Sequence, residues 1–208
     1  MIRYEALATA HWNPEPYPWS CVPELLDDGT CSQLVEGFPT TGFAFHQRVG
    51  GRTVRQFGRE VVKRSGRALV LDQRATLDPP WRRLLTAFLS ADYAARLGTC
   101  ASMDLEPLSL EISLWRMPSG CFNPRHGNDP RKRLTQVVYL GGAGGPVQGG
   151  ELVIHGAGEG TQGDVVLPAT GGTSVVFACS PEAWHEVRRV TGGERLSVGL
   201  HFYQGAIS

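Results

Sequence analysis

The chain of 208 residues is long enough to bury a full-sized hydrophobic core within one domain. Its 20 lysine and arginine residues balance 20 aspartate and glutamate residues, so no net charge attracts nucleic acid or an anionic membrane. The start of the chain resembles neither a signal peptide nor a transit peptide, and nowhere do about 18 apolar residues run together. We therefore expect a single domain, 1–208, that binds neither nucleic acid nor membranes.

The cysteines indicate the cellular compartment. They are odd in number and include no C-x-x-C pair: Cys21, Cys31, Cys100, Cys121 and Cys179. This pattern disfavours a disulfide framework and a structural zinc site, and it is typical of free thiols in a reducing cytoplasm. We expect a cytoplasmic protein that is either a monomer or a homodimer.

The first part of the chain carries few strand signals. Residues 1–20 are rich in proline and aromatic residues and predict an irregular or short-strand arm. Alternation from Phe43 to Arg52 predicts a strand that ends in a hairpin at Gly50-Gly51. Residues 69–72 predict a further short strand.

Helical signals gather in the same half. Residues 22–34 carry a weak apolar pattern, interrupted by Asp-Asp-Gly. The strong helices are 79–89, with early prolines and Asp78 as a candidate cap, and 91–97, which should end at Gly98. We assign 1–107 to supporting helices and extra strands.

From Leu108 onward, short strands punctuated by glycine recur about every ten residues, a pattern that favours a barrel or a two-sheet jelly roll. The expected strands are 108–117, 133–140, 149–156, 164–168, 173–179, 185–190 and 195–203. We assign 108–208 to a jelly-roll core. The predicted fold is therefore mainly β with supporting helices.

Two of the six histidines have informative neighbours. His126 lies among turn-forming residues and precedes two oxygen-bearing side chains, Asn128 and Asp129. His185 follows the apolar strand 174–178. Both should lie at strand ends of one sheet system, where a barrel mouth can gather them. Two imidazoles with one short oxygen ligand form the facial arrangement of mononuclear Fe(II) oxygenases, which leaves positions open for a keto acid and O₂.

One basic residue, Arg195, is a candidate for binding an anionic ligand. Arg195 lies on the last expected strand, ten residues after His185, and a guanidinium can hold a carboxylate through two hydrogen bonds. In isolation Arg195 would be interpreted as an exposed charge at a strand end. We interpret the run Arg131-Lys132-Arg133 as a solvated turn.

The segment from Leu114 to Tyr203 resembles the prolyl-4-hydroxylase-like branch of the 2-oxoglutarate/Fe(II) dioxygenase superfamily. The motifs that carry the resemblance occur in order: P-x-G-x-F-x-x-x-H ending at His126, LTQVVYL at 134–140, GGEL at 149–152, WHEV at 184–187 and GERLS at 193–197. Five motifs in register are more specific than any one of them.

The resemblance implies a double-stranded β-helix, a cupin-like jelly roll, with iron at its open end. It implies that His126 and His185 bind Fe(II), and that Arg195 and Tyr139 hold the distal carboxylate of 2-oxoglutarate. The implied cofactors are Fe(II), 2-oxoglutarate as co-substrate and O₂, with ascorbate as a reductant.

One departure from the family pattern concerns the third metal ligand. The pattern is His-x-Asp, and here Asn128 stands where the family has aspartate. Asn128 shares a strand face with His126 and could bind through its amide oxygen. Alternatively Asp129, in the turn before Pro130, could swing in, or water or halide could take the position. With Asn128, Fe(II) and dianionic 2-oxoglutarate sum to zero charge, and a chloride would restore minus one.

We expect an oxidoreductase, a 2-oxoglutarate-dependent oxygenase that oxidises an unactivated C–H bond of a small molecule. An amino acid or an intermediate in natural-product biosynthesis is the preferred substrate, with hydroxylation, desaturation or radical cyclisation as the outcome. The alternatives are a halogenase, a peptidyl hydroxylase, a cupin-type metal enzyme without 2-oxoglutarate, or a non-catalytic jelly-roll binding protein. Candidates for the pocket wall are Trp12, Tyr17, Trp19, Phe43, His46, Arg55, Phe57, Arg59, Trp115 and Met117.

Overall fold

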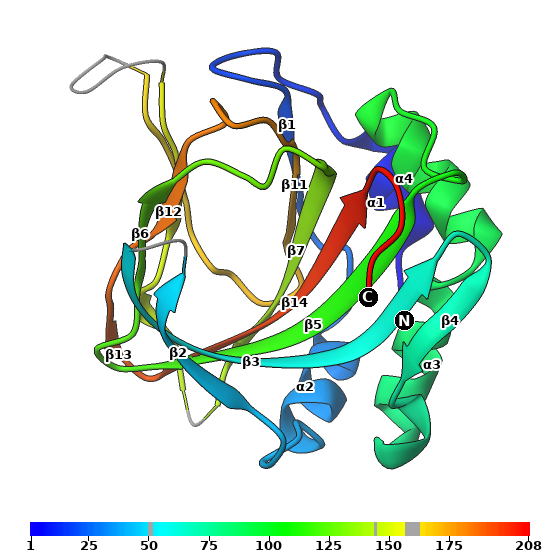
Figure 1. Ribbon diagram of the computed structural model, residues 1–208. Helices are drawn as coiled ribbons and strands as arrows, with labels where there is room; N and C mark the ends of the chain where they lie inside the picture. The colour runs from blue at the N-terminus through cyan, green and yellow to red at the C-terminus, as the bar shows by residue number, and fades with distance from the viewer. Residues whose placement is uncertain (50–51, 144, 157–162) are drawn as a thin grey trace.

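The computed structural model describes residues 1–49, 52–143, 145–156 and 163–208 (Figure 1). Over these residues, a large antiparallel sheet has the strand order β1-β11-β7-β14-β5-β3-β2, with β4 paired to β3. Its strands are β1 (Trp19–Val22), β2 (Ala44–Val49), β3 (Arg52–Ser65), β4 (Ala68–Asp72), β5 (Ser109–Pro118), β7 (Lys132–Gly142), β11 (Ser174–Ala178) and β14 (Glu194–Tyr203).

A smaller antiparallel sheet, in the order β10-β9-β12-β6, lies across the barrel interior from the large one (Figure 1). Its strands are β6 (Asn123–His126), β9 (Leu152–Ile154), β10 (Val165–Leu167) and β12 (His185–Val187). A two-stranded ribbon joins β8 (Gln148–Gly149) to β13 (Val190–Gly192). The two facing sheets confirm the predicted jelly roll.

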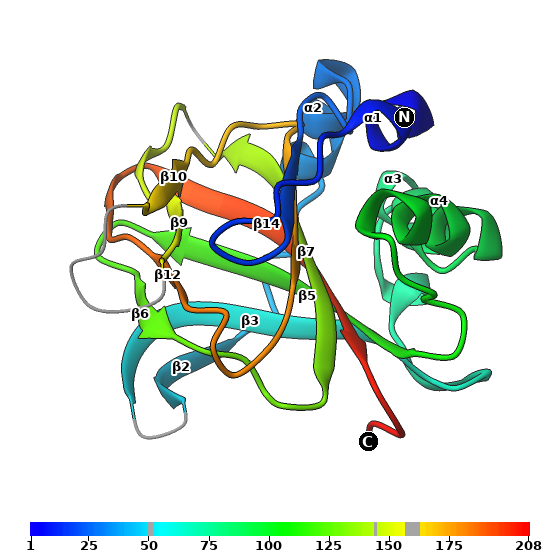
Figure 2. The ribbon, with the colours of Figure 1, turned by 90° about the horizontal axis from the view of Figure 1, so that it is seen from above.

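Helices cover the outer face of the large sheet, away from the barrel interior (Figure 2). They are α1 (Tyr4–Thr9), α2 (Asp28–Glu36), α3 (Pro79–Phe88) and α4 (Ala91–Ala101), with a short 3₁₀ helix η1 (Arg74–Thr76). Helix α3 buries Trp81, Leu84, Leu85 and Phe88 at helical spacing. Each such side chain contributes roughly 1.5–3 kcal/mol when fully buried.

Strand β7 shows that one face of the large sheet packs against the helices while the other face lines the barrel interior. Leu134 and Val138 belong to the hydrophobic core shared with the helices, and Gln136 accepts a 2.9 Å hydrogen bond from the hydroxyl of Tyr93 on α4. Thr135 and Val137, which alternate with them, line the barrel interior. Because side chains alternate along a strand, one sequence supplies both a packed core and a cavity wall.

The N-terminal arm differs from its prediction. Within residues 1–20, α1 precedes β1, where an irregular or short-strand arm was expected. Leu7 is buried, and the ring of Tyr4 packs edge-on against Tyr93 with centroids 6.2 Å apart. These contacts with α4 stabilise a helix too short to persist by local propensity.

Two helix predictions need correction. Helix α4 continues through Gly98 to Ala101, and Ser102 ends it with a positive φ of 50°. Gly98 is required inside the helix because a Cβ there would lie 2.5 Å from the carbonyl oxygen of Met103. Asp78 occupies the N-cap position of α3, but its side chain makes no capping hydrogen bond.

Some strands were missed or drawn differently. The 14-residue β3 and the four-residue β6 were not predicted, and the expected strand 185–190 is divided between β12 and β13. The predicted hairpin at Gly50-Gly51 lies outside the described residues, although the flanking strands β2 and β3 do pair antiparallel. In the described part of the chain, no helix has the length and apolar character needed to cross a bilayer.

Candidate active site

The two candidate histidine ligands lie side by side on neighbouring strands. In the register of β12 with β6, His185 stands directly opposite His126. The two ring centroids are 4.2 Å apart, and the ring of Phe177 lies 4.9 Å from that of His185. Cross-strand pairing therefore brings together two imidazoles that are about 60 positions apart in the chain.

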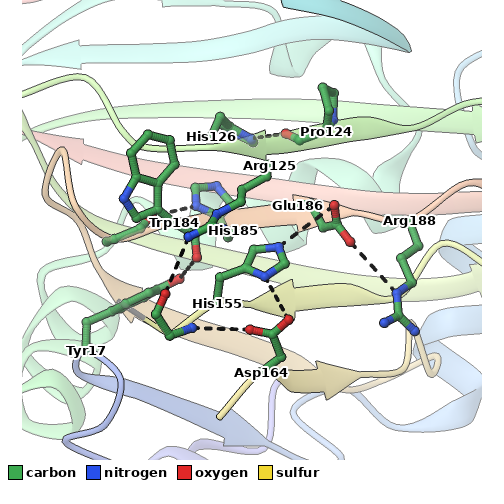
Figure 3. A network of polar contacts seen from close by, with 12 residues as sticks. Tyr17, Pro124, Arg125, His126, His155, Asp164, Trp184, His185, Glu186 and Arg188 are labelled. Carbon is green, nitrogen blue, oxygen red and sulfur yellow. Dashed lines mark hydrogen bonds and ion pairs between the residues drawn. The ribbon is translucent and has the colours of Figure 1, made fainter. Parts of the chain in front are cut away.

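Hydrogen bonds fix the tautomer of both rings. The Nδ1 atom of His126 lies 2.8 Å from the carbonyl oxygen of Pro124, and that of His185 lies 3.0 Å from the carbonyl oxygen of Ala183 (Figure 3). A carbonyl oxygen only accepts, so each Nδ1 carries the proton and each Nε2 carries the lone pair. This is the state in which a histidine binds a metal through Nε2.

Contacts on the outer side of β12 hold the neighbours of His185 (Figure 3). The carbonyl oxygen of Trp184 accepts hydrogen bonds from the hydroxyl of Tyr17 (3.0 Å) and from the backbone N–H of His155 (2.9 Å). The ring of His155 lies 3.0 Å from the carboxylate of Asp164 and 3.8 Å from that of Glu186. These contacts fix the strand from which His185 points into the barrel.

Asn128 is tied to the loop that precedes His185. Its side-chain amide nitrogen donates to the carbonyl oxygen of Ala183 at 3.3 Å, and its backbone N–H donates to that of Ser180 at 3.3 Å. The amide oxygen is thus the atom of Asn128 suited to a metal. Gly127 permits the close approach of the two loops, because a Cβ there would lie 2.0 Å from the carbonyl oxygen of Pro181.

The carboxylate of Asp129 is engaged locally. It accepts a 2.8 Å hydrogen bond from the backbone N–H of Arg131 and pairs with the Arg131 guanidinium at 3.2 Å. The side-chain hydrogen bond from Arg131 lowers the pKa of Asp129 below its usual value. Among the described residues, no group of three His, Cys, Asp or Glu side chains is placed to share a metal ion.

Arg195 is a buried cation without a counter-ion among the described residues. It is 3% exposed, and its Nη1 lies 3.3 Å from the sulfur of Met117 and 3.2 Å from the hydroxyl of Ser197. No carboxylate of the described chain lies within 4.0 Å of it. Gly150 makes room for this side chain, since a Cβ at that position would lie 3.0 Å from Cδ of Arg195.

Tyr139 lies beside Arg195, and each of the two side chains has one polar atom without a hydrogen-bond partner among the described residues. The Arg195 guanidinium carbon is 4.9 Å from the centre of the Tyr139 ring. Within the part of the chain that the structure covers, the Nε of Arg195 and the hydroxyl of Tyr139 are both buried without a hydrogen-bond partner. Burial raises the pKa of Tyr139, against the opposing charge of Arg195. Two buried, unsatisfied donors beside a positive charge fit one carboxylate, which would remove the desolvation cost of both.

A cavity of about 440 Å³ connects the histidine pair with Arg195, whereas Tyr139 lies behind Arg195 and does not line it. The cavity takes residues from both sheets: His126, Asn128, Asp129, His185 and Arg195 line it, together with His46, Trp115 and Met117 of the expected wall. The other wall candidates, which were Trp12, Tyr17, Trp19, Phe43, Arg55, Phe57 and Arg59, do not line it. Its volume is typical of a site for a small ligand.

Several cavity residues were missed by sequence reasoning. Lys132 was interpreted as part of a solvated turn, and this is wrong: it begins β7 and lines the cavity. His201 was not singled out, although it lies an even number of residues after Arg195 on β14 and therefore on the same face. Its Nδ1 lies 3.1 Å from the hydroxyl of Thr135, and burial lowers its pKa well below the usual value. Gln56 also lines the cavity.

The comparisons agree with the fold. Residues 113–203 match the family model of the 2OG-Fe(II) oxygenase superfamily. An oxidoreductase of the 2OG-Fe(II) oxygenase family from Burkholderia pseudomallei has a similar structure, with a TM-score of 0.67 and 20% identity over 90% of this chain and 86% of that chain. A prolyl-4-hydroxylase from Pseudomonas putida has a TM-score of 0.60 and 22% identity over 97% of each chain.

A third similar structure is the non-heme alpha ketoglutarate dependent epimerase SnoN from nogalamycin biosynthesis, with a TM-score of 0.58 and 18% identity over 89% of this chain and 78% of that chain. None of the curated proteins matches the sequence. The match over residues 113–203 agrees with the family that the motifs predicted, and the family's name gives Fe(II) and 2-oxoglutarate (2OG) as the cofactors of its members.

Proposed function

We propose that the protein oxidises a C–H bond of a small molecule, with Fe(II) held by His126, His185 and the amide oxygen of Asn128. The distal carboxylate of 2-oxoglutarate binds Arg195 and the hydroxyl of Tyr139. When bound, the iron supplies the activation of O₂ that couples conversion of 2-oxoglutarate into succinate and CO₂ to oxidation of the substrate. One observation carries this proposal: among the described residues, the Nε of Arg195 and the hydroxyl of the adjacent Tyr139 are buried without a partner, and Arg195 lines the same cavity as the histidine pair.

The residues around the site have distinct tasks. The carbonyl oxygens of Pro124 and Ala183 orient the two imidazoles, and Arg195 orients the keto acid. Apolar side chains on the cavity wall, Val137, Leu152 and Phe177, exclude water from the reacting groups. The cavity of about 440 Å³ favours a small substrate over a protein side chain presented by a large partner.

The hydrogen bonds of the two candidate residues favour Asn128 over Asp129 as the third metal ligand. The Asp129 carboxylate already accepts from the backbone and side chain of Arg131, and moving it to a metal would break both contacts. The nitrogen of the Asn128 amide is engaged by Ala183, which leaves the oxygen for the metal. Because this ligand is neutral, a chloride ion could share the metal, and halogenation is the second candidate function.

The direct test is succinate formation from 2-oxoglutarate by the purified protein with Fe(II), O₂ and ascorbate, with and without chloride. We expect turnover in the wild type and its loss in Arg195→Ala. Mn(II) binding, measured anaerobically by electron paramagnetic resonance, should tighten about tenfold in Asn128→Asp, since a carboxylate adds a charge-assisted ligand worth roughly 1.4 kcal/mol or more.

Each outcome has a separate meaning. Turnover that requires chloride would favour the halogenase. If neither Mn(II) nor Fe(II) binds, the jelly roll is a binding module and the proposal is wrong. A peptide that stimulates turnover where no small molecule does would favour peptidyl hydroxylation instead.

A further inference from the structure

Lys132 places a positive charge in the cavity at a distance from the 2-oxoglutarate site. It is half-buried at the start of β7, whereas its neighbours Arg131 and Arg133 are exposed. Its ammonium lies 5.4 Å from the centre of the Tyr203 ring, and the residue lines the same cavity as the histidine pair. The register of β14 with β7 is irregular between Phe202 and Tyr203, next to this position.

No carboxylate neutralises this ammonium at close range. Within the described residues, Lys132 has no ion pair inside 4.0 Å and no side-chain hydrogen bond. Asp129 is engaged by Arg131, and Glu111 acts on Lys132 only at longer range and does not line the cavity. Burial lowers the pKa of Lys132, which is the expected sign for a cation removed from water without a partner.

The cavity thus has two cationic side chains, and one keto acid cannot serve both. In the register of β14 with β7, Arg195 lies opposite Gly142 at one end of β7. Tyr203 lies opposite Lys132 at the other end. Residues 195 and 203 are eight positions apart on β14, which corresponds to about 26 Å of strand. The carboxyl carbons of 2-oxoglutarate are separated by four bonds of about 1.5 Å each, so the molecule spans roughly 5–6 Å at most. A 2-oxoglutarate molecule held by Arg195 therefore leaves Lys132 available to a second anion.

The sheet register places a neutral polar contact on the wall near Arg195, outside the reach of a small acid at Lys132. Gln56 on β3 is 9% exposed and lines the cavity, and its side-chain amide has no hydrogen-bond partner among the residues described. Trp115 lies on the same wall, where Gly58 makes room for it: a Cβ at Gly58 would lie 2.6 Å from the indole. This wall combines an aromatic face with one free amide.

We propose that the substrate is a small carboxylic acid whose carboxylate binds Lys132, at the other end of β14 from Arg195. This inference rests on the proposed function, because it concerns the substrate end of the same cavity. The charge of Lys132 selects an anion, and the volume of about 440 Å³ suits a free acid better than an acidic side chain presented by a folded protein.

The experiment measures ligand binding by thermal shift on protein loaded anaerobically with Mn(II) and 2-oxoglutarate. The probes are straight-chain carboxylates from acetate to octanoate and the twenty standard L-amino acids, each beside its methyl ester. We expect at least one acid to stabilise the protein while its ester does not. Lys132→Gln should weaken binding of that acid about 10- to 100-fold, the size of a lost hydrogen bond to a charged group. Lys132→Arg should retain most of the affinity.

Lys63 provides a matched control, since it is the only other lysine of the chain and pairs with Glu60 at 3.0 Å. Lys63→Gln should bind the same acid within about twofold of the wild type. Equal binding of acids and esters, failure of every acid, or unchanged affinity in a folded Lys132→Gln variant would overturn the proposal. So would equally tight binding of an acetylated, amidated tripeptide with a central glutamate.

The two proposals fail separately. The proposed function is tested by the stabilisation that 2-oxoglutarate gives through Arg195, and the substrate class is tested by the acids that act through Lys132. A protein that binds 2-oxoglutarate but no further acid keeps the first proposal and loses the second.

Discussion

Arg195→Met tests the anion site, because it should have opposite effects on stability with and without 2-oxoglutarate. Arg195 is 3% exposed and has no carboxylate partner in the described chain. Methionine has a similar unbranched stem and would pack on Met117 and the Tyr139 ring, which Arg195 now contacts. Replacing buried charge by apolar volume is commonly neutral or stabilising by about 1–4 kcal/mol.

The magnitudes follow from the contacts. In a chain of this length 1 kcal/mol shifts Tm by about 2–4 °C, so the 2-oxoglutarate-free variant should have an unchanged or higher Tm. For the wild type, 2-oxoglutarate at about 100 times Kd adds about 2.7 kcal/mol, or roughly 5–11 °C. The variant loses two charge-assisted hydrogen bonds of about 1.5–3 kcal/mol each. Its Kd therefore rises at least about 100-fold, and the same concentration adds no more than about 0.4 kcal/mol.

The assay is thermal unfolding of the Mn(II)-loaded protein under anaerobic conditions, with and without 2-oxoglutarate. Arg133→Met is the matched control, because Arg133 is exposed two residues away from the cavity-lining Thr135 on β7, and its 2-oxoglutarate shift should equal that of the wild type. The reasoning is refuted if Arg195→Met unfolds at a clearly lower temperature without 2-oxoglutarate, or if it keeps the full ligand-induced shift.

Three further predictions concern other parts of the site. Tyr139→Phe removes a buried hydroxyl that has no partner among the described residues, so the stability of the ligand-free protein should not fall. The Kd of 2-oxoglutarate for the Mn(II)-loaded protein should rise about tenfold, and a large loss of ligand-free stability would contradict this. Gly127→Ala forces a Cβ against the carbonyl oxygen of Pro181 and should lower the free energy of unfolding in urea by about 1–3 kcal/mol. Gly29→Ala, where the nearest atom to the new Cβ is 3.5 Å away, should leave it unchanged. Equal effects of the two substitutions would argue against the close approach at Gly127. Burial raises the pKa of Cys179 to about 11, so its alkylation by iodoacetamide, followed by mass spectrometry, should increase about tenfold per pH unit from pH 7 to 10. A rate that levels off above about pH 8.5 would show a thiol of ordinary pKa.

The jelly roll could be predicted because apolar and polar residues alternate along the strands of the C-terminal half. Strand β3 was missed, and its sequence shows why. Strand β3 buries Val54, Gln56 and Gly58 at alternate positions, but only the first of these is apolar. Gln56 lines the cavity and Gly58 makes room for Trp115. Because the cavity-facing positions of β3 hold a polar residue and a glycine, the strand lacks the alternation of apolar residues by which a strand is recognised.

The candidate ligands could be named from motifs, but their neighbours could not. Whether Asp129 or Asn128 faces the metal depends on a local contact, the pairing of Asp129 with Arg131, that no spacing rule contains. Lys132 was placed in a solvated turn because its neighbours in the sequence are charged. The sheet register, with its irregularity next to Tyr203, puts Lys132 in the cavity. Such register shifts arise from tertiary pairing and leave no mark in composition.

The direct pairing of His126 with His185 makes their separation a property of sheet alignment. Strands β6 and β12 have four and three residues, and a slip of one position would turn one ring to the opposite face of the small sheet. Substitutions that touch neither ring, such as the loss of the Tyr17 hydroxyl that holds Trp184, can therefore disturb the pair. Conversely, a substitution at the cavity rim that leaves the alignment of β6 and β12 intact keeps the spacing of the two imidazoles, so the contacts offered to a substrate can change without moving the candidate metal ligands.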